Sequence, residues 1–102
     1  MSGVTTINIG KPDLEKEWFL YIVQCRDSSY YCGISDDVEN RVKNHNKGTG
    51  AKYTRSRLPV LLVYSEKHTS ISEARKREAQ IKNWSRVKKE QLIAGFPRLR
   101  SE

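Results

Sequence analysis

The sequence predicts one small α/β domain whose elements follow the order β-β-α-β-α-α. Two short runs of aromatic and β-branched residues, at 18–24 and 30–34, stand close together and are typical of strands. A third apolar run at 60–64 is followed by two segments that begin with helix-capping serines. A length of 102 residues allows one domain with a single modest core.

The first two strands are expected to pair as an antiparallel hairpin, because only a short segment with the turn residues 26–28 separates them. Successive side chains of a strand point to opposite faces of the sheet. Tyr21 and Tyr31 can therefore serve one site only if an odd number of residues, or a bulge, connects the strands. A plain two-residue turn would place the two tyrosines on opposite faces.

A helix is predicted next, with N-cap residues at 35–37 and a stop at the glycine-containing segment 48–50. Four of its residues recur at helical spacing and share one face: Val38, Arg41, Val42 and His45. Arg41 and His45 flank the apolar part of this face. They are either solvated boundary residues or groups that reach toward the sheet. Residues 51–57 are expected to form a basic loop that carries one aromatic residue.

The apolar run at 60–64 is expected to be a third, well-buried strand. Ser70 and Glu73 fit a capping box that opens a helix extending to about residue 84. Ser85 then caps a shorter helix that ends at Gly95. Residues 1–16 are expected to be a flexible arm and 97–102 a frayed tail, which leaves 17–96 as the domain.

The second long helix contains a carboxylate where an apolar residue is expected. Its apolar stripe consists of Ile71, Ala74, Ile81 and Trp84, and position 78 belongs to the same stripe. That position is Glu78, and a carboxylate facing a core is unfavourable unless it is paired or bound to a cation. One interpretation is a salt bridge at the edge of the stripe with Lys82 or Arg75. The other is a metal ligand or catalytic acid that faces a site on the sheet.

The composition restricts the class of partner. The formal net charge of +7 favours phosphate-bearing partners, although small proteins also carry excess charge for solubility. No apolar run is long enough to span a bilayer, and the first residues show no signal pattern, so a cytoplasmic protein without a membrane partner is expected. Cys25 and Cys32 are then predicted to be free thiols that could be neighbours across the hairpin.

Five segments carry a more specific signal: residues 19–21, residues 31–33, residues 36–41 with His45, residues 51–55 and residues 72–82. In this order and spacing they resemble the GIY-YIG nuclease superfamily, and most closely its small single-domain branch, the UPF0213 or YhbQ-like proteins. The resemblance covers about residues 17–94. The first tripeptide keeps only its tyrosine and the second has Cys32 in place of isoleucine, but neither change removes a reactive group. The late asparagine of some members has only Asn83 as a counterpart.

The resemblance implies an α/β (α+β) domain of GIY-YIG type, with a three-stranded antiparallel sheet flanked by helices. It also implies metal-dependent phosphodiester hydrolysis, with a catalytic set of Tyr21, Tyr31, Arg41, His45 and Glu78. Glu78 would bind one divalent ion, Mg²⁺ or Mn²⁺, and Arg41 would clamp the phosphate. Tyr21 would be the general base and Tyr31 would orient water or phosphate. His45 would assist proton transfer or hold Tyr21 in place.

The expected substrate is DNA, with RNA as a second option, read with low sequence specificity because no separate targeting domain is evident. The residues expected to contact it are Gly33, which permits close backbone approach, and Lys52, Tyr53, Arg55 and Arg57 of the basic loop. No obligate protein partner is evident from the sequence. Two alternative functions remain open. One is a non-catalytic nucleic-acid-binding module that uses the same basic face. The other is a protein adaptor with an exposed patch formed by Trp18, Trp84 or Phe96.

Overall fold

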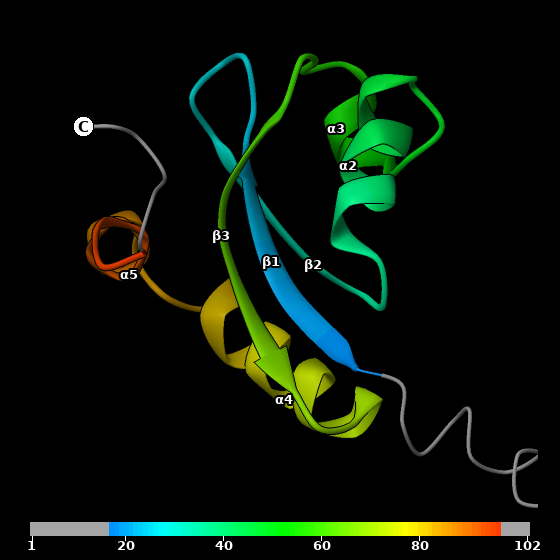
Figure 1. Ribbon diagram of the computed structural model, residues 1–102. Coiled ribbons are helices and arrows are strands. Elements are labelled where there is room, and N and C mark those ends of the chain that lie inside the picture. The colour runs from blue at the N-terminus through cyan, green and yellow to red at the C-terminus, as the bar shows by residue number, and fades with distance from the viewer. Residues whose placement is uncertain (1–16, 97–102) are drawn as a thin grey trace, which may run out of the picture.

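The computed structural model describes residues 17–96, which form a sheet with helices on both faces (Figure 1). The strands are β1 (Trp18–Gln24), β2 (Tyr30–Ser35) and β3 (Leu61–His68). The helices are α2 (Val38–Asn46), α3 (Lys52–Arg55), α4 (Ile71–Lys82) and α5 (Arg86–Ala94). The sheet is antiparallel, with strand order β2-β1-β3. The predicted three-stranded antiparallel sheet with flanking helices is therefore confirmed.

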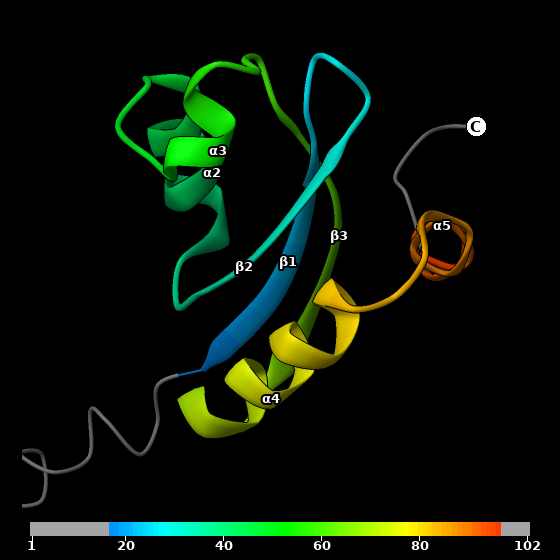
Figure 2. The ribbon, with the colours of Figure 1, turned by 180° about the vertical axis from the view of Figure 1, so that it is seen from behind.

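The helices divide between the two faces of the sheet. Helices α2 and α3 cover one face, and α4 and α5 lie on the other, as the two opposite views show (Figures 1 and 2). The central strand β1 is consequently buried on both sides, and Leu20, Tyr21, Ile22 and Val23 are each at most 1% exposed. A strand that is buried on both faces has a continuous apolar run rather than an alternating pattern, and β1 has such a run.

The register of the hairpin places Tyr21 and Tyr31 on the same face of the sheet, as a site that uses both tyrosines requires. Tyr21 pairs with Gly33, and Val23 pairs with Tyr31. The connection between Gln24 and Tyr30 has an odd number of residues, so Tyr21 and Tyr31 lie on the same face. Ser28 takes the left-handed conformation in this turn, with φ of 73°.

The core consists of two clusters, one on each face of the sheet. The cluster toward α4 and α5 contains Leu20, Ile22, Cys32, Ile81 and Ile93. The cluster toward α2 contains Tyr21, Val23, Cys25 and Val60. The two cysteines are free thiols, and they are buried in different clusters. Strand alternation thus separates two residues that could have been neighbours across the hairpin.

Two predictions about the middle of the chain are wrong. The run at 60–64 is not a well-buried strand, because β3 is the edge strand and Leu61 and Leu62 are 66% and 41% exposed. Val60, which precedes the strand, is the buried residue of this run. The segment predicted as a basic loop contains the one-turn helix α3, which is too short to produce a helical hydrophobic period.

The predicted helix starts are confirmed by side-chain caps. Asp37 accepts a hydrogen bond from the Asn40 amide at 3.2 Å, and Ser70 accepts one from the Glu73 amide at 3.1 Å. Ser85 accepts one from the Lys88 amide at 3.2 Å. Helix α4 ends at Lys82, two residues before the predicted end. Within the described residues, no helix has the length and apolar character needed to cross a membrane.

Candidate functional site

The centre of the site is a buried pair formed by a tyrosine and a histidine. Tyr21 on β1 is 1% exposed, and His45 on α2 is fully buried. The Tyr21 hydroxyl lies 2.8 Å from Nε2 of His45. The Tyr21 ring passes over Gly33, where an added Cβ would lie 2.7 Å from the phenolic oxygen. The space that glycine leaves on β2 is therefore filled by the tyrosine itself.

The other ring nitrogen of His45 is held by the segment that follows α2. Nδ1 lies 2.9 Å from the hydroxyl of Thr54 and 3.4 Å from the backbone nitrogen of Ala51. An added Cβ at Gly50 would overlap Nδ1, so the chain can pass this close to the imidazole only as glycine. Burial and the nearby charge of Arg41 both lower the pKa of His45, which favours its neutral form.

Arg41 joins this pair from the preceding turn of α2. Burial raises the pKa of Tyr21 to about 12, while a hydrogen bond from the Arg41 side chain and its positive charge act in the opposite direction. Arg41 is only partly buried, so one end of the group reaches the surface beside a buried phenol. A cation placed there favours the ionised form of Tyr21 and can also meet an incoming phosphate.

Tyr31 extends the site from the interior toward the surface. Its ring meets His45 edge-on with centroids 5.4 Å apart, and it stacks with Tyr53 at 6.1 Å and an interplanar angle of 20°. Tyr53, on α3, is 39% exposed. The predicted residues Tyr21, Tyr31, Arg41, His45 and Tyr53 are thus brought together on the α2 face of the sheet.

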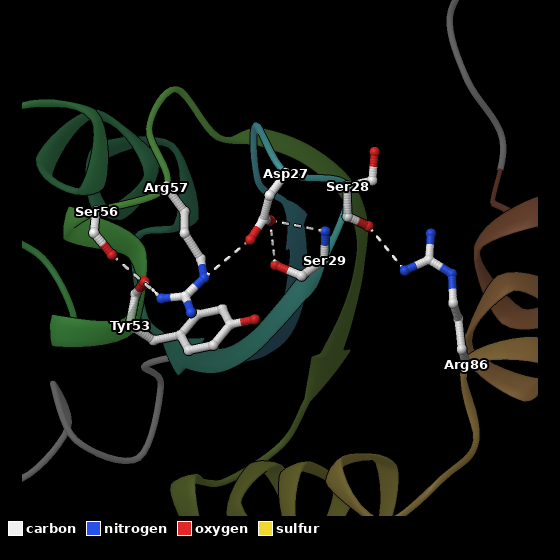
Figure 3. Close-up of polar contacts among 7 residues, drawn as sticks. All are labelled: Asp27, Ser28, Ser29, Tyr53, Ser56, Arg57 and Arg86. Atoms are coloured by element: carbon white, nitrogen blue, oxygen red, sulfur yellow. Dashed lines mark hydrogen bonds and ion pairs between the residues drawn. The ribbon is translucent and has the colours of Figure 1, made fainter.

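Arg57 has a different setting from the other basic residues predicted to contact nucleic acid. Its guanidinium lies 3.9 Å from the centroid of the Tyr53 ring, donates to Asp27 at 3.1 Å and donates to the Tyr53 carbonyl at 2.8 Å (Figure 3). It therefore ties the end of α3 to the turn of the hairpin. Arg86 of α5 holds the same turn through the Ser28 carbonyl, at 2.9 Å. Lys52 and Arg55 are exposed on α3.

Glu78 lies on the opposite side of the sheet from the tyrosine and histidine pair. Helix α4 packs on β1 and β2, and the charge of Glu78 contributes to raising the pKa of Cys32, whose main cause is burial. The Glu78 side chain is 22% exposed and pairs with Lys82 at 3.3 Å. Between residues 17 and 96, no recorded hydrogen bond or ion pair joins Glu78 to the residues around Tyr21. Its charge acts on Cys32 of β2, and β2 is an edge strand of the sheet.

The donors present determine what kind of metal could bind. Within the described part of the chain, no group of three or more His, Cys, Asp or Glu side chains is placed to hold an ion. A structural zinc site, which needs four protein ligands, does not fit this arrangement. A single carboxylate fits Mg²⁺ or Mn²⁺, because these ions retain several waters and use substrate phosphate as a further ligand.

Two residues of the site were not predicted from the sequence. Thr54 is fully buried and contacts His45, and Gly50 makes room for the same ring. Thr54 belongs to residues 51–55, one of the segments that carry the family resemblance. A threonine in such a polar segment does not by itself indicate which residue it contacts. The three aromatic residues named for an adaptor patch, Trp18, Trp84 and Phe96, are all partly buried rather than exposed. Trp84 packs under Arg77 and Lys88, and Phe96 packs on Tyr64.

Comparison with known proteins assigns residues 17–91 to a family model described as the GIY-YIG catalytic domain. UPF0213 protein SSP2268 of Staphylococcus saprophyticus is 53% identical over 76 residues, which cover 74% of this chain and 93% of that protein. UPF0213 protein SA0446 of Staphylococcus aureus is 55% identical over 75 residues, covering 74% of this chain and 92% of the relative.

Two structures determined by solution NMR are similar in fold. The UPF0213 protein BH0048 of Bacillus halodurans is 45% identical, with a TM-score of 0.50 over 76% of this chain and 83% of the other. Protein EF2693 of E. faecalis is 37% identical, with a TM-score of 0.56 over 88% of this chain and 98% of the other. In both comparisons the likeness extends over most of each chain.

Proposed function

This chain belongs to the GIY-YIG family, and from that membership we propose that it is a nuclease that hydrolyses phosphodiester bonds in DNA with one divalent metal ion. The observation that carries the proposal is the buried contact between Tyr21 and His45, 2.8 Å apart, with Arg41 beside it. A hydrogen-bonded phenol, a neutral imidazole and a guanidinium at the surface supply a base, a proton partner and a phosphate clamp.

In this proposal Tyr21 takes a proton from the attacking water. A phenol can do so only as its anion, so its raised pKa has to be offset by positive groups nearby. Arg41 would supply part of that offset and would bind a nonbridging oxygen of the scissile phosphate. Tyr31, which stands between His45 and the exposed Tyr53, would orient the phosphate or the water.

Glu78 would hold the divalent ion, Mg²⁺ or Mn²⁺, with water and substrate phosphate completing the coordination. When bound, such an ion supplies charge stabilisation for the oxygen that leaves. To bind the ion, Glu78 would have to give up its ion pair with Lys82. The Lys82 side chain is 52% exposed and so is free to move into solvent. An exposed i,i+4 pair of this type contributes only about 0.3–0.5 kcal/mol, so the exchange is energetically easy.

DNA recognition would be directed at structure or strandedness rather than at sequence. Lys52 and Arg55 are exposed beside Tyr53 and would contact the phosphate backbone, with the edge of Tyr53 available to a base. The net charge of +7 supports a backbone-directed mode of binding to DNA, and to RNA by the same chemistry.

The test is cleavage of branched, single-stranded and duplex DNA, and of RNA, by the purified chain with Mg²⁺ or Mn²⁺. Cleavage is expected on at least one DNA substrate and is expected to disappear with Glu78→Ala and with Tyr21→Phe. Cleavage that persists in both variants would come from a contaminant and would refute the proposal.

A second candidate function is a nucleic-acid-binding module without turnover. The observation that favours it is the pairing of Glu78 with Lys82, on the face of the sheet opposite to Tyr21. This function predicts salt-sensitive binding that is unchanged in Glu78→Ala. Metal-dependent cleavage that is lost in that variant would eliminate it.

A further inference from the structure

Partly buried cations are few in this protein, and two of them have no carboxylate partner. Between residues 17 and 96, the lysines and arginines that are partly buried rather than exposed are Arg41, Arg57, Arg77 and Lys89. Arg57 pairs with Asp27 at 3.1 Å, and Arg77 pairs with Glu66 at 2.8 Å. No ion pair to a carboxylate of this part of the chain is recorded for the other two. A cation that is withdrawn from water in this way is a good candidate for binding an external anion.

Lys89 is partly buried because it lies on the face of α5 that packs on the sheet. It stands three residues before Leu92 and four before Ile93, so the three side chains share one face of the helix. Leu92 and Ile93 both pack in the core cluster that contains Cys32. All other lysines of the described residues are exposed. The environment of Lys89 therefore differs from that of an ordinary solvated surface lysine.

The one carboxylate of α5 is already engaged. Glu90 follows Lys89 in the chain, but it accepts a hydrogen bond from Arg86 at 2.9 Å and one from the Tyr30 hydroxyl at 3.4 Å. Arg86 also lies over the Tyr30 ring at 4.6 Å and donates to the Ser28 carbonyl at 2.9 Å (Figure 3). These contacts fix the start of α5 beside the hairpin and leave the charge of Lys89 uncompensated within its own helix.

Lys89 and Glu78 lie in one region of the sheet, although they belong to different helices. Burial is the main cause that raises the pKa of the Cys32 thiol on β2, and the charge of Glu78 raises it further, whereas the charges of Lys82 and Lys89 lower it. Glu78 is itself paired with Lys82 at 3.3 Å. Among the described residues, Lys89 is thus a partly buried cation without a recorded carboxylate partner, in the region of the side chain proposed to hold the divalent ion.

We propose that Lys89 binds a phosphate of the DNA backbone on the α4–α5 side of the sheet. The inference rests on the proposed function for the nature of the ligand. An ammonium group offers three donors and a full charge, and DNA presents one phosphate anion per nucleotide. Lys89 is then the counterpart of Arg41, which has its phosphate on the other face. Because β2 is an edge strand, DNA that passes its open edge reaches Lys52 and Arg55 of α3 on one face and Lys89 on the other.

The test is DNA binding by the full chain in EDTA, so that binding is measured without metal-dependent cleavage. The probes are a short fluorescein-labelled DNA duplex and one of its single strands, followed by fluorescence anisotropy. Lys89→Met keeps an unbranched apolar stem and removes the charge. Its affinity should fall about eightfold at about 0.1 M salt, because one phosphate contact contributes a factor that scales as roughly the −0.9 power of salt concentration. The slope of log affinity against log salt should decrease by about one. Lys89→Arg keeps the charge and should bind like the wild type.

Lys67→Met is the matched control. It removes the same charge from β3, at the opposite edge of the sheet, where the Lys67 side chain is 61% exposed and pairs with Glu17. Its affinity for both probes should stay close to that of the wild type. If Lys67→Met weakens binding as much as Lys89→Met, the effect is one of total charge and the proposal is overturned. The proposal also fails if a folded Lys89→Met protein binds both probes like the wild type.

A second measurement needs no variant and decides the question even if Lys89→Met does not fold. The ¹⁵N-labelled wild-type chain is titrated with the unlabelled single strand or duplex, and backbone amide signals are followed. Signals of residues 85–90 should shift together with those of residues 52–55. Shifts confined to residues 52–55, or no binding at all, overturn the proposal. Absence of cleavage with Mg²⁺ or Mn²⁺ would reject the nuclease function and leave this binding result standing.

Discussion

The phenolic oxygen of Tyr21 and Nε2 of His45 lie 2.8 Å apart in the protein interior, although 24 positions separate the two residues in the chain. The contact joins the central strand of the sheet to α2. Two polar groups buried in this way are stable only because they satisfy each other. Changes to either residue are therefore expected to affect both activity and stability.

Removal of the Tyr21 hydroxyl is expected to abolish most of the activity. Tyr21→Phe removes the proposed general base and should lower the cleavage rate by about 10²–10⁴-fold. It also leaves Nε2 of His45 without a partner and should reduce the free energy of unfolding by about 1–3 kcal/mol. Tyr30→Phe is the matched control, because its hydroxyl makes only an exposed 3.4 Å contact with Glu90. Equal cleavage rates for the two variants would contradict the role of Tyr21.

Neutralisation of Glu78 should separate cleavage from DNA binding. Glu78→Gln keeps the side-chain shape and removes the charge that is proposed to hold the ion, so cleavage should fall about a hundredfold or more. Affinity for DNA without metal should not decrease. Glu90→Gln is the control, because Glu90 is also a glutamate with an i,i+4 partner, Arg86 at 2.9 Å. If Glu78→Gln and Glu90→Gln cleave equally well, Glu78 is not the metal ligand.

A methyl group at Gly33 should displace Tyr21. The added Cβ would lie 2.7 Å from the phenolic oxygen and 2.8 Å from the ring carbon that carries it, which is too close for either to remain in place. Gly33→Ala should therefore lower the free energy of unfolding by about 1–3 kcal/mol, measured by urea denaturation. Gly95→Ala should change it little, because the nearest atom there is 3.6 Å away. Similar values for the two variants would disprove the close packing of Tyr21 on Gly33.

Acid should destabilise the protein through His45. The pKa of His45 is lowered in the folded state, so below about pH 6.5, the ordinary value for histidine, the unfolded chain binds more protons than the folded one. Stability should therefore decrease as the pH falls from 7 toward the folded pKa, with a slope of at most about 1.4 kcal/mol per pH unit. The measurement is the free energy of unfolding at several pH values. His45→Gln should remove this slope, whereas His68→Gln should retain it.

Two arginines near Tyr53 should give opposite phenotypes. Arg57→Ala breaks the contacts with Asp27 and with the Tyr53 ring, so the melting temperature should fall. Arg55→Ala removes an exposed charge from α3 and should leave the melting temperature unchanged while weakening DNA binding. The slope of log affinity against log salt should decrease by about one in Arg55→Ala. A larger thermal effect from Arg55 than from Arg57 would contradict these roles.

Several features of the fold were predictable because neighbouring residues produce them. The caps at Asp37, Ser70 and Ser85 use hydrogen bonds to backbone groups three residues away. The shared face of Tyr21 and Tyr31 followed from strand alternation once the connecting loop had an odd number of residues. Family motifs marked the residues around Tyr21 and gave holding Tyr21 in place as one of two roles for His45, but they did not indicate the contacts of Thr54 and Gly50 with that histidine.

Other features depend on packing and were predicted incorrectly or not at all. An apolar run such as 60–64 is compatible with a central or an edge strand, and only the order β2-β1-β3 places Leu61 and Leu62 in solvent. The burial of Thr54 against His45 requires the short helix α3 to fold back on α2. No periodic pattern encodes such a contact.

The sequence by itself determined the strands, the helix starts, the basic charge and the family motifs, because these depend on local hydrogen bonding, side-chain period and composition. Only the tertiary structure decided that Tyr21 lies 2.8 Å from His45, that Thr54 and Ala51 contact the far side of that ring, and that Glu78 lies on the opposite face of the sheet, on α4. The physical reason is that these contacts join distant segments. Their distances are set by how the helices pack on the two faces of one sheet.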